Sequence, residues 1–175
     1  FLLLFPSLIF SQEENSGYNI DVNNFYGKIL NHSDHISHLT NQSPEGVFIS
    51  FNKKTFGEKE WQSAYNFPDY GASFHYENTK NETLGDLYGL YGHYNFYFLN
   101  RKVQFKIAQG VAYTTNPHDK ETNSKNYAFG SKIVANTNFA VNYSTPLFDR
   151  FELKAGLLFT HFSNGRIKAP NSGVN

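Results

Sequence analysis

The sequence predicts an all-β protein, an antiparallel up-and-down barrel of the outer-membrane type with about eight strands. Apolar and polar residues alternate with a period of two along several segments. Those segments reach roughly ten residues or more, the length that a tilted strand needs to cross a bilayer. Aromatic residues make up 18% of a chain whose mean hydropathy is only −0.52. A polar average with so many rings indicates a chain with one apolar and one polar face.

The first ten residues, FLLLFPSLIF, are continuously apolar except for Pro6 and Ser7. We interpret residues 1–12 as part of a secretory signal peptide, with the small residue Ser11 near the cleavage point. The alternative is a buried strand or a short core helix. Ten apolar residues are too few for a membrane-spanning helix, which needs roughly 20. Because the chain does not begin with Met, we expect its N-terminus to be incomplete.

Residues 13–44 form a polar, Asn-rich segment with one candidate strand, Asn24–Leu30. We assign residues 45–175 to a single barrel domain, because period-two alternation runs through them with short turns between strands. The clearest strands are predicted at Leu84–Leu99, Val103–Tyr113, Phe129–Thr145 and Phe151–Ser163. Seven strands precede Pro170, and an eighth would open at Ser172 and lie mostly outside this chain.

The alternation assigns a face to each side chain. In an outer-membrane barrel the apolar face meets lipid and the small polar residues line the lumen. Lys106, Lys132 and Lys154 fall on the polar face, where a lumen can pair them with other polar groups. A soluble lipocalin-like barrel or sandwich, with the apolar face as its core, is the alternative. The rings expected in the interfacial girdles are Tyr88, Tyr91, Tyr94, Tyr113, Tyr127 and Tyr143.

Charge and composition exclude several functions. Lys and Arg number 15 against 15 Asp and Glu, so no nucleic-acid partner is expected. The absence of Cys excludes disulfides, a thiol nucleophile and thiolate metal sites. The imidazoles His32, His35 and His38 recur every three residues and make a metal site conceivable, but a solvated loop is the simpler interpretation, and no metal or cofactor is expected.

The pair His161 and Ser163 carries the candidate chemistry. Residues two apart on a strand point to the same face, about 6.5–7 Å apart along the chain. An imidazole at that spacing can act as the base that a serine hydroxyl needs to attack an acyl carbon. The following Asn164 and Gly165 end the strand and can turn N–H groups toward an oxyanion. The pair continues the apolar stripe of its strand, so it would meet lipid esters at the membrane border.

The stretch THFSNGRIKAPNSGVN, Thr160–Asn175, resembles the signature of the PagL-type lipid A deacylase (acyloxyacyl hydrolase) family. The resemblance runs back through most of the chain. The matching segments are His35–Leu39, Lys53–Gly57, Trp61–Tyr65, Phe67–Gly71, Leu84–Gly85, Asn123–Asn126 and Gly130–Lys132. It implies an eight-stranded outer-membrane barrel that removes an ester-linked acyl chain from lipid A.

The resemblance also implies site roles. Its His and Ser match His161 and Ser163, and the Asn associated with its oxyanion hole matches Asn164. The family orients its His with a Glu, but at the matching spacing this chain has Asn175. An amide oxygen can still accept a hydrogen bond from Nδ1–H. We expect the segment that begins at Ser172 to return antiparallel beside Phe151–Ser163 and bring Asn175 to the height of His161.

The sequence therefore predicts an exported outer-membrane esterase that acts on lipid A in lipopolysaccharide, with membrane lipid as its surroundings and a homodimer left open. Two alternatives remain at this point. One is a non-enzymatic barrel, structural or lipid-binding, in which His161 and Ser163 are ordinary rim residues. The other is a barrel phospholipase or acyltransferase.

Overall fold

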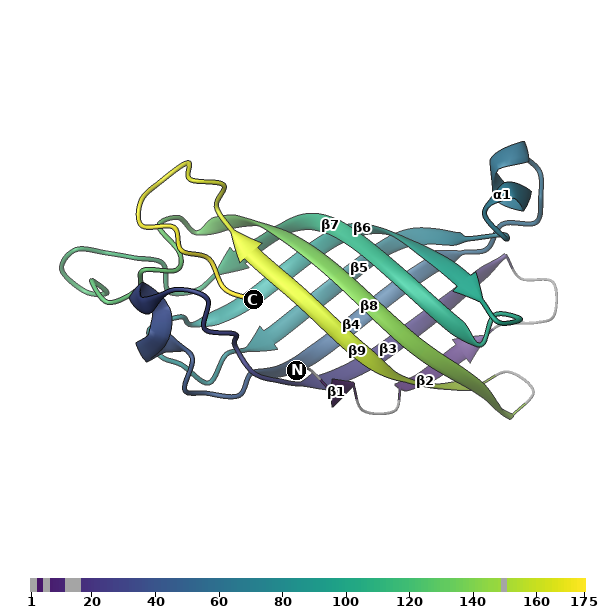
Figure 1. Ribbon diagram of the computed structural model, residues 1–175, viewed down its shortest axis with the longest axis horizontal. Helices are drawn as coiled ribbons and strands as arrows, with labels where there is room; N and C mark the ends of the chain where they lie inside the picture. The colour runs from purple at the N-terminus through teal and green to yellow at the C-terminus, as the bar shows by residue number, and fades with distance from the viewer. Residues whose placement is uncertain (1–2, 5–6, 12–16, 149–150) are drawn as a thin grey trace.

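Seven strands, β3–β9, run up and down in sequence order, each antiparallel to the next (Figure 1). The structure is a computed structural model that describes residues 3–4, 7–11, 17–148 and 151–175. The strands are β3 (Tyr18–Tyr26), β4 (Glu45–Lys53), β5 (Asp69–Asn78), β6 (Asp86–Phe98), β7 (Val103–Thr114), β8 (Ile133–Phe148) and β9 (Phe151–Ser163). The all-β, antiparallel up-and-down prediction is confirmed. Among the described residues, no helix is long and apolar enough to cross a membrane.

Two short strands, β1 (Leu3–Leu4) and β2 (Ser7–Ser11), lie between β9 and β3 and pair with both. From the sequence we expect a strand that begins at Ser172 in this place. Ser172–Asn175 contribute one antiparallel bridge, between Phe162 and Val174. The signal-peptide interpretation of residues 1–12 stays a prediction, and residues 1–2, 5–6 and 12 lie outside the described part of the chain.

The chain enters the barrel wall earlier than expected. β3 pairs with β4 over its whole length, from Tyr18 opposite Lys53 to Tyr26 opposite Glu45. It therefore lies inside the predicted polar segment 13–44, and the wall begins before residue 45. Polar side chains are frequent in β3 because its inner face lines a polar lumen, which makes the strand resemble a loop in sequence.

The side chains are distributed inside out. The exposed outer face carries large apolar residues, which include Leu90, Val111, Ile133, Phe139, Val141, Leu157 and Phe159. The buried inner face carries polar ones, which include Ser50, Asn52, His93, Asn95, Gln104, Asn136, Asn138 and Asn142. A soluble barrel would show the reverse, whereas lipid outside and polar groups inside are typical of outer-membrane barrels.

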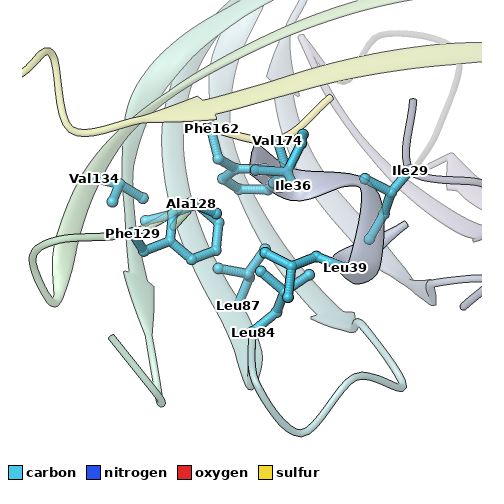
Figure 2. Packing of buried hydrophobic residues seen from close by; sticks show 11 residues of the cluster. Ile29, Ile36, Leu39, Leu84, Leu87, Ala128, Phe129, Val134, Phe162 and Val174 are labelled. Atoms are coloured by element: carbon cyan, nitrogen blue, oxygen red, sulfur yellow. The ribbon is translucent and has the colours of Figure 1, made fainter. Parts of the chain in front are cut away.

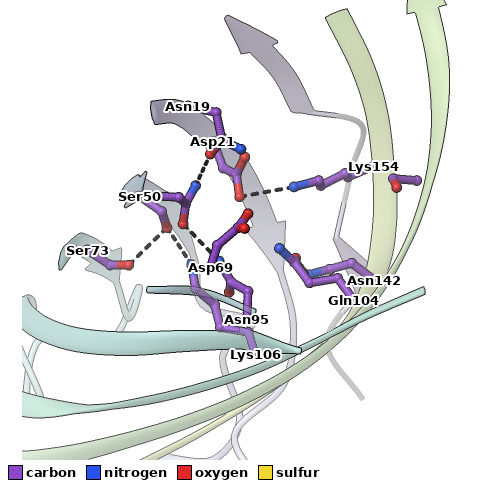
Figure 3. A network of polar contacts seen from close by, with 12 residues as sticks. Asn19, Asp21, Ser50, Asp69, Ser73, Asn95, Gln104, Lys106, Asn142 and Lys154 are labelled. Atoms are coloured by element: carbon purple, nitrogen blue, oxygen red, sulfur yellow. Dashed lines mark hydrogen bonds and ion pairs between the residues drawn. The ribbon is translucent and has the colours of Figure 1, made fainter. Parts of the chain in front are cut away.

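Charged and amide groups form a connected network in the lumen (Figure 3). The buried Lys154 Nζ lies 3.1 Å from Asp21 Oδ2, and Lys106 donates to Ser50 Oγ. Two of the three predicted lumen lysines are thus inside and paired. The prediction for Lys132 is wrong, because this residue is exposed and precedes β8.

Apolar side chains close one end of the barrel (Figure 2). They come from the 3₁₀ helix η1 (Asp34–Leu39), from the loop before β6, from the loop before β8 and from the end of β9. The largest are Ile36, Leu39, Leu84, Phe129 and Phe162, each 1% exposed or less. The C-terminus lies at this end, and α1 (Glu60–Ala64) at the other (Figure 1).

The loop before β8 folds over the same end. The Asn126 side-chain oxygen accepts the backbone N–H groups of Ala128 and Phe129, both at 3.0 Å. This contact turns Phe129 inward and takes it out of the strand, so the predicted strand Phe129–Thr145 begins only at Ile133. Earlier in the same loop, the Asp119 carboxylate accepts two backbone N–H groups, which lowers its pKa.

One ring predicted for the interfacial girdles lies elsewhere. Tyr91 is 2% exposed and points into the barrel, where its hydroxyl contacts His75 Nδ1 at 2.7 Å. Its position follows from the alternation of β6, since Tyr88 and Tyr94 have the opposite parity and are exposed. The prediction counted Tyr91 with Tyr88 and Tyr94 because the three rings lie close together in the sequence, although Tyr91 points to the other face.

The Lys154–Asp21 pair gives a test of the lumen network. We expect Lys154→Ala to lower the free energy of unfolding by about 3–5 kcal/mol, because it leaves a buried carboxylate unpaired. The measurement is a urea titration of the folded barrel, followed by heat-modifiable gel mobility. As a control, Lys80→Ala removes the exposed Lys80–Glu45 pair and should cost about 1 kcal/mol or less. Equal losses in the two variants would contradict the network.

Candidate active site

His161 and Ser163 lie at the end of β9 and share its outer face. Phe162 between them is 1% exposed and packs into the apolar cluster at the barrel end. Because successive strand residues alternate, this buried ring directs both neighbours outward. Both are partly exposed, at the border between the apolar wall and the loops. The outward face expected for the pair is therefore observed.

The segment that ends at Asn175 returns beside β9, as expected. Phe162 and Val174 exchange two backbone hydrogen bonds, with N–O distances of 2.9 and 3.0 Å. This antiparallel bridge places residue 175 opposite His161, and His161 Nδ1 hydrogen-bonds to Asn175 Oδ1. An amide oxygen only accepts, so His161 carries its proton on Nδ1 and keeps a free lone pair on Nε2.

Ser163 Oγ lies among amide groups. It accepts the Gly165 backbone N–H at 3.1 Å and Asn171 Nδ2–H at 3.2 Å, and its own hydroxyl donates to Asn171 Oδ1 at 3.4 Å. Asn171 is a site residue that the sequence analysis missed. No spacing rule points to it, because it reaches Ser163 only through the fold of the loop after β9. Among the contacts of the described residues, no hydrogen bond joins Ser163 to His161, so the hydroxyl must rotate before it gives its proton to Nε2.

Asn164 anchors this loop. Its side chain is 3% exposed, with Nδ2 2.6 Å from the Lys168 carbonyl oxygen and Oδ1 accepting the Arg166 N–H. Its backbone N–H donates to Asn171 Oδ1 at 2.7 Å. The donors of Asn164 are thus engaged within the loop, and they orient Asn171. The N–H of Gly165 is the one directed at Ser163, and Gly165 permits this turn because its φ is +63°.

Gly173 covers the gap between the two candidate catalytic side chains. A Cβ at this position would lie 3.4 Å from His161 Cε1 and 3.6 Å from Ser163 Cβ. It would also lie 2.6 Å from the Phe162 carbonyl oxygen, and the φ of Gly173 is +67°. Glycine therefore permits the backbone to pass close to His161 and Ser163 and leaves the space between their side chains free of a Cβ atom.

An apolar groove of about 340 Å³ lies along β9 next to the site, and its lining includes the buried Leu158 and Thr160 as well as outer-face residues. Leu157 and Phe159 of β9 and Phe139 and Val141 of β8 form its floor, and Asn175 lies at its edge. Lys28 and Leu30 line its other side. A groove with this lining accepts hydrocarbon, and Asn175 links it to His161.

The three imidazoles of the N-terminal loop have separate partners. His38 Nε2 donates to the Lys125 carbonyl oxygen at 2.9 Å, and the rings of His35 and His38 each lie 6.2 Å from the Tyr127 ring. His32 contacts the segment that carries Asn175. No group of three metal-ligating side chains occurs in the part of the chain that the structure describes. These contacts give the metal hypothesis no support.

An apolar outer face and a polar inner face are typical of outer-membrane β-barrels, and His161 and Ser163 lie at the outer rim of this barrel. The family model described as lipid A 3-O-deacylase (PagL) matches residues 45–175. The chain belongs to this family, which confirms the resemblance seen in its C-terminal motif. Neither the comparison with curated proteins nor that with solved structures gave a significant match.

Gly173 offers a steric test of the site. We expect Gly173→Ala to lower labelling of Ser163 by a fluorophosphonate probe at least tenfold, because the new methyl group enters the gap beside His161 and strains a positive-φ backbone. Labelling is measured by mass spectrometry of the modified peptide. The matched control is Gly92→Ala, because a Cβ there meets nothing within 4 Å. Equal labelling of the two variants would show that Gly173 does not border the reacting atoms.

Proposed function

We propose that the protein is an outer-membrane esterase that hydrolyses the 3-O-linked acyl ester of lipid A by a Ser–His mechanism. One observation carries this proposal: His161 is oriented by Asn175 on the outer face of the barrel, beside Ser163 and an apolar groove. A substrate embedded in the membrane can reach such a site laterally, without entering the polar lumen. Family membership supports the same substrate.

The first step forms an acyl-enzyme. His161 Nε2 takes the proton of Ser163 Oγ, and Oγ adds to the ester carbonyl carbon to give a tetrahedral oxyanion. The Gly165 N–H and the Asn171 amide donate to Oγ at 3.1 and 3.2 Å, and we assign them as the donors that turn to that oxyanion once Oγ has reacted. As the intermediate collapses, Nε2–H gives its proton to the leaving sugar oxygen.

The second step consumes water. His161 Nε2 takes a proton from the water molecule, whose oxygen adds to the acyl carbon. As the intermediate collapses, Nε2–H gives this proton to Ser163 Oγ, which leaves as the free hydroxyl. The products are a free fatty acid and lipid A with a free 3-hydroxyl group. Asn175 holds the imidazole in the Nδ1–H form throughout but supplies no charge to the imidazolium.

The surroundings suit an amphiphilic anion. The apolar groove takes the acyl chain, and the exposed Arg166 and Lys168 lie in the loop directly after Ser163, where they can face lipid phosphates. Asn164 serves as the anchor of the oxyanion loop, through Asn171, and Gly165 as a donor.

We expect Ser163→Ala and His161→Asn each to abolish release of fatty acid from purified lipid A, with assembly of the barrel unchanged. The double variant should be no worse than either single variant, because nucleophile and base act as one unit. The assay is fatty-acid release in detergent, with folding checked by heat-modifiable mobility. Ser131→Ala, a serine in the loop before β8, is the control and should leave the rate unchanged.

Near-normal release by Ser163→Ala would place the nucleophile elsewhere. No release by the folded wild-type protein would favour the non-enzymatic barrel. Release of fatty acid from phospholipid vesicles in place of lipid A would favour the phospholipase alternative.

Asn175→Ala tests the orienting group. We expect turnover to fall by roughly tens- to thousands-fold, since the imidazole loses its Nδ1 partner and with it the preference for the active tautomer. The measurement is kcat on lipid A beside the wild type. Asn142→Ala, which removes an amide from the lumen face of β8, is the control and should leave kcat unchanged. Unchanged turnover in Asn175→Ala would mean that a dyad suffices.

A further inference from the structure

The Asn175 amide has two different ends, and only one orientation gives an active His161. With Oδ1 toward His161, Nδ1 carries the proton and Nε2 is a base. With the amide reversed, Nδ2 would donate to His161 Nδ1, the proton would lie on Nε2, and no base would face Ser163. A carboxylate has no such choice, because both of its oxygens accept. An asparagine at this position therefore needs a neighbour that selects its orientation.

His32 contacts the other end of that amide. Asn175 Nδ2 lies 3.1 Å from His32 Nδ1, and His32 Nε2 lies 2.9 Å from the Ser172 carbonyl oxygen. A backbone carbonyl only accepts, so the contact with Ser172 requires the proton of neutral His32 to lie on Nε2. His32 Nδ1 then carries a lone pair and faces two groups, Asn175 Nδ2 at 3.1 Å and the Leu30 carbonyl oxygen at 3.3 Å, of which only Nδ2 can donate to it. That lone pair accepts an N–H and repels an oxygen. The contact is therefore satisfied only when Asn175 Nδ2 faces His32.

The hydrogen bonds run in one direction from a fixed starting point. The Ser172 carbonyl sets the tautomer of His32, His32 sets the orientation of Asn175, and Asn175 sets the tautomer of His161. With a neutral His32, the donors and acceptors in this series of hydrogen bonds follow from the Ser172 carbonyl. The free lone pair on His161 Nε2 is the result.

The backbone holds His32 in place independently of its side chain. The Leu30 N–H donates to the Asn175 carbonyl oxygen at 2.9 Å, and the neighbouring Ile29 is buried in the apolar cluster together with Val174 (Figure 2). The His32 side chain itself is exposed. Its removal should therefore cost little packing, and its influence must come from the direction of its hydrogen bonds.

We infer that His32 is a positioning residue that selects the amide orientation of Asn175 and thereby keeps His161 in the tautomer that can act as a base. This role rests on the proposed esterase function and extends it to a residue outside the His–Ser–Asn set. It is specific to an amide at position 175. A carboxylate there makes His32 dispensable.

The test is a set of substitutions in two backgrounds, Asn175 and Asn175→Asp. His32→Ala should lower kcat about two- to tenfold in the Asn175 protein, the range of one hydrogen bond, and should change nothing in the Asn175→Asp background. His32→Lys supplies donors and no acceptor, so it favours the reversed amide. We expect it to lower kcat more than His32→Ala in the Asn175 protein and to preserve or raise kcat beside Asp at position 175.

A second readout does not depend on turnover. Nitrogen-15 NMR of the His161 ring in micelles should show the proton on Nδ1 in the wild type and a shift toward Nε2 in His32→Lys. His35→Ala is the matched control, since His35 lies in the same region and packs against Tyr127 without a contact to Asn175. It should alter neither the tautomer nor kcat.

Three outcomes decide the matter. Losses confined to the Asn175 background, with the tautomer shift, support the role of His32. Equal losses in both backgrounds, or an unchanged tautomer in His32→Lys, overturn it in favour of a structural role. A tautomer shift in a protein that releases no fatty acid from lipid A supports the positioning contact and overturns the proposed function alone.

Discussion

The structure depends on one constraint: in lipid, backbone N–H and C=O groups must find partners within the protein, so strands pair side by side and curl into a barrel. Once the strands pair, strict alternation divides the side chains into an outer apolar and an inner polar set. The same alternation decides where chemistry can occur. Because Phe162 is directed inward to close the barrel end, His161 and Ser163 are directed outward, on the face that carries the apolar residues.

A polar site at the edge of an apolar wall must satisfy its own hydrogen bonds, and this chain does so mainly with neutral amides. Asn164 and Asn171 hold the loop around Ser163, and Asn175 holds His161. Neutral amides avoid the cost of placing a carboxylate beside lipid. An amide, unlike a carboxylate, has one accepting and one donating end, so its orientation matters. The contact between His32 and Asn175 selects that orientation.

The strictly alternating strands could be predicted from the sequence. So could the pair His161 and Ser163 at the end of β9. Lys106 and Lys154 were correctly placed in the lumen, and the antiparallel return of Asn175 beside His161 followed from the register of two neighbouring strands. The alternating pattern gave a wrong prediction where it continued by chance into a loop. Phe129 and Lys132 fit the pattern but precede β8. Asn171 and His32 could not be predicted, because loops with no periodic pattern bring them to the site, Asn171 from eight residues after Ser163 and His32 from the other end of the chain.

The central claim is that Ser163, on the outer rim, removes an ester-linked acyl chain from lipid A. The most direct measurement is mass spectrometry of lipid A extracted from cells that produce either the wild-type protein or Ser163→Ala in equal, folded amounts. We expect lipid A that lacks one ester-linked acyl chain with the wild type and intact lipid A with the variant. Identical lipid A from both cultures, whether intact or shortened, would contradict it.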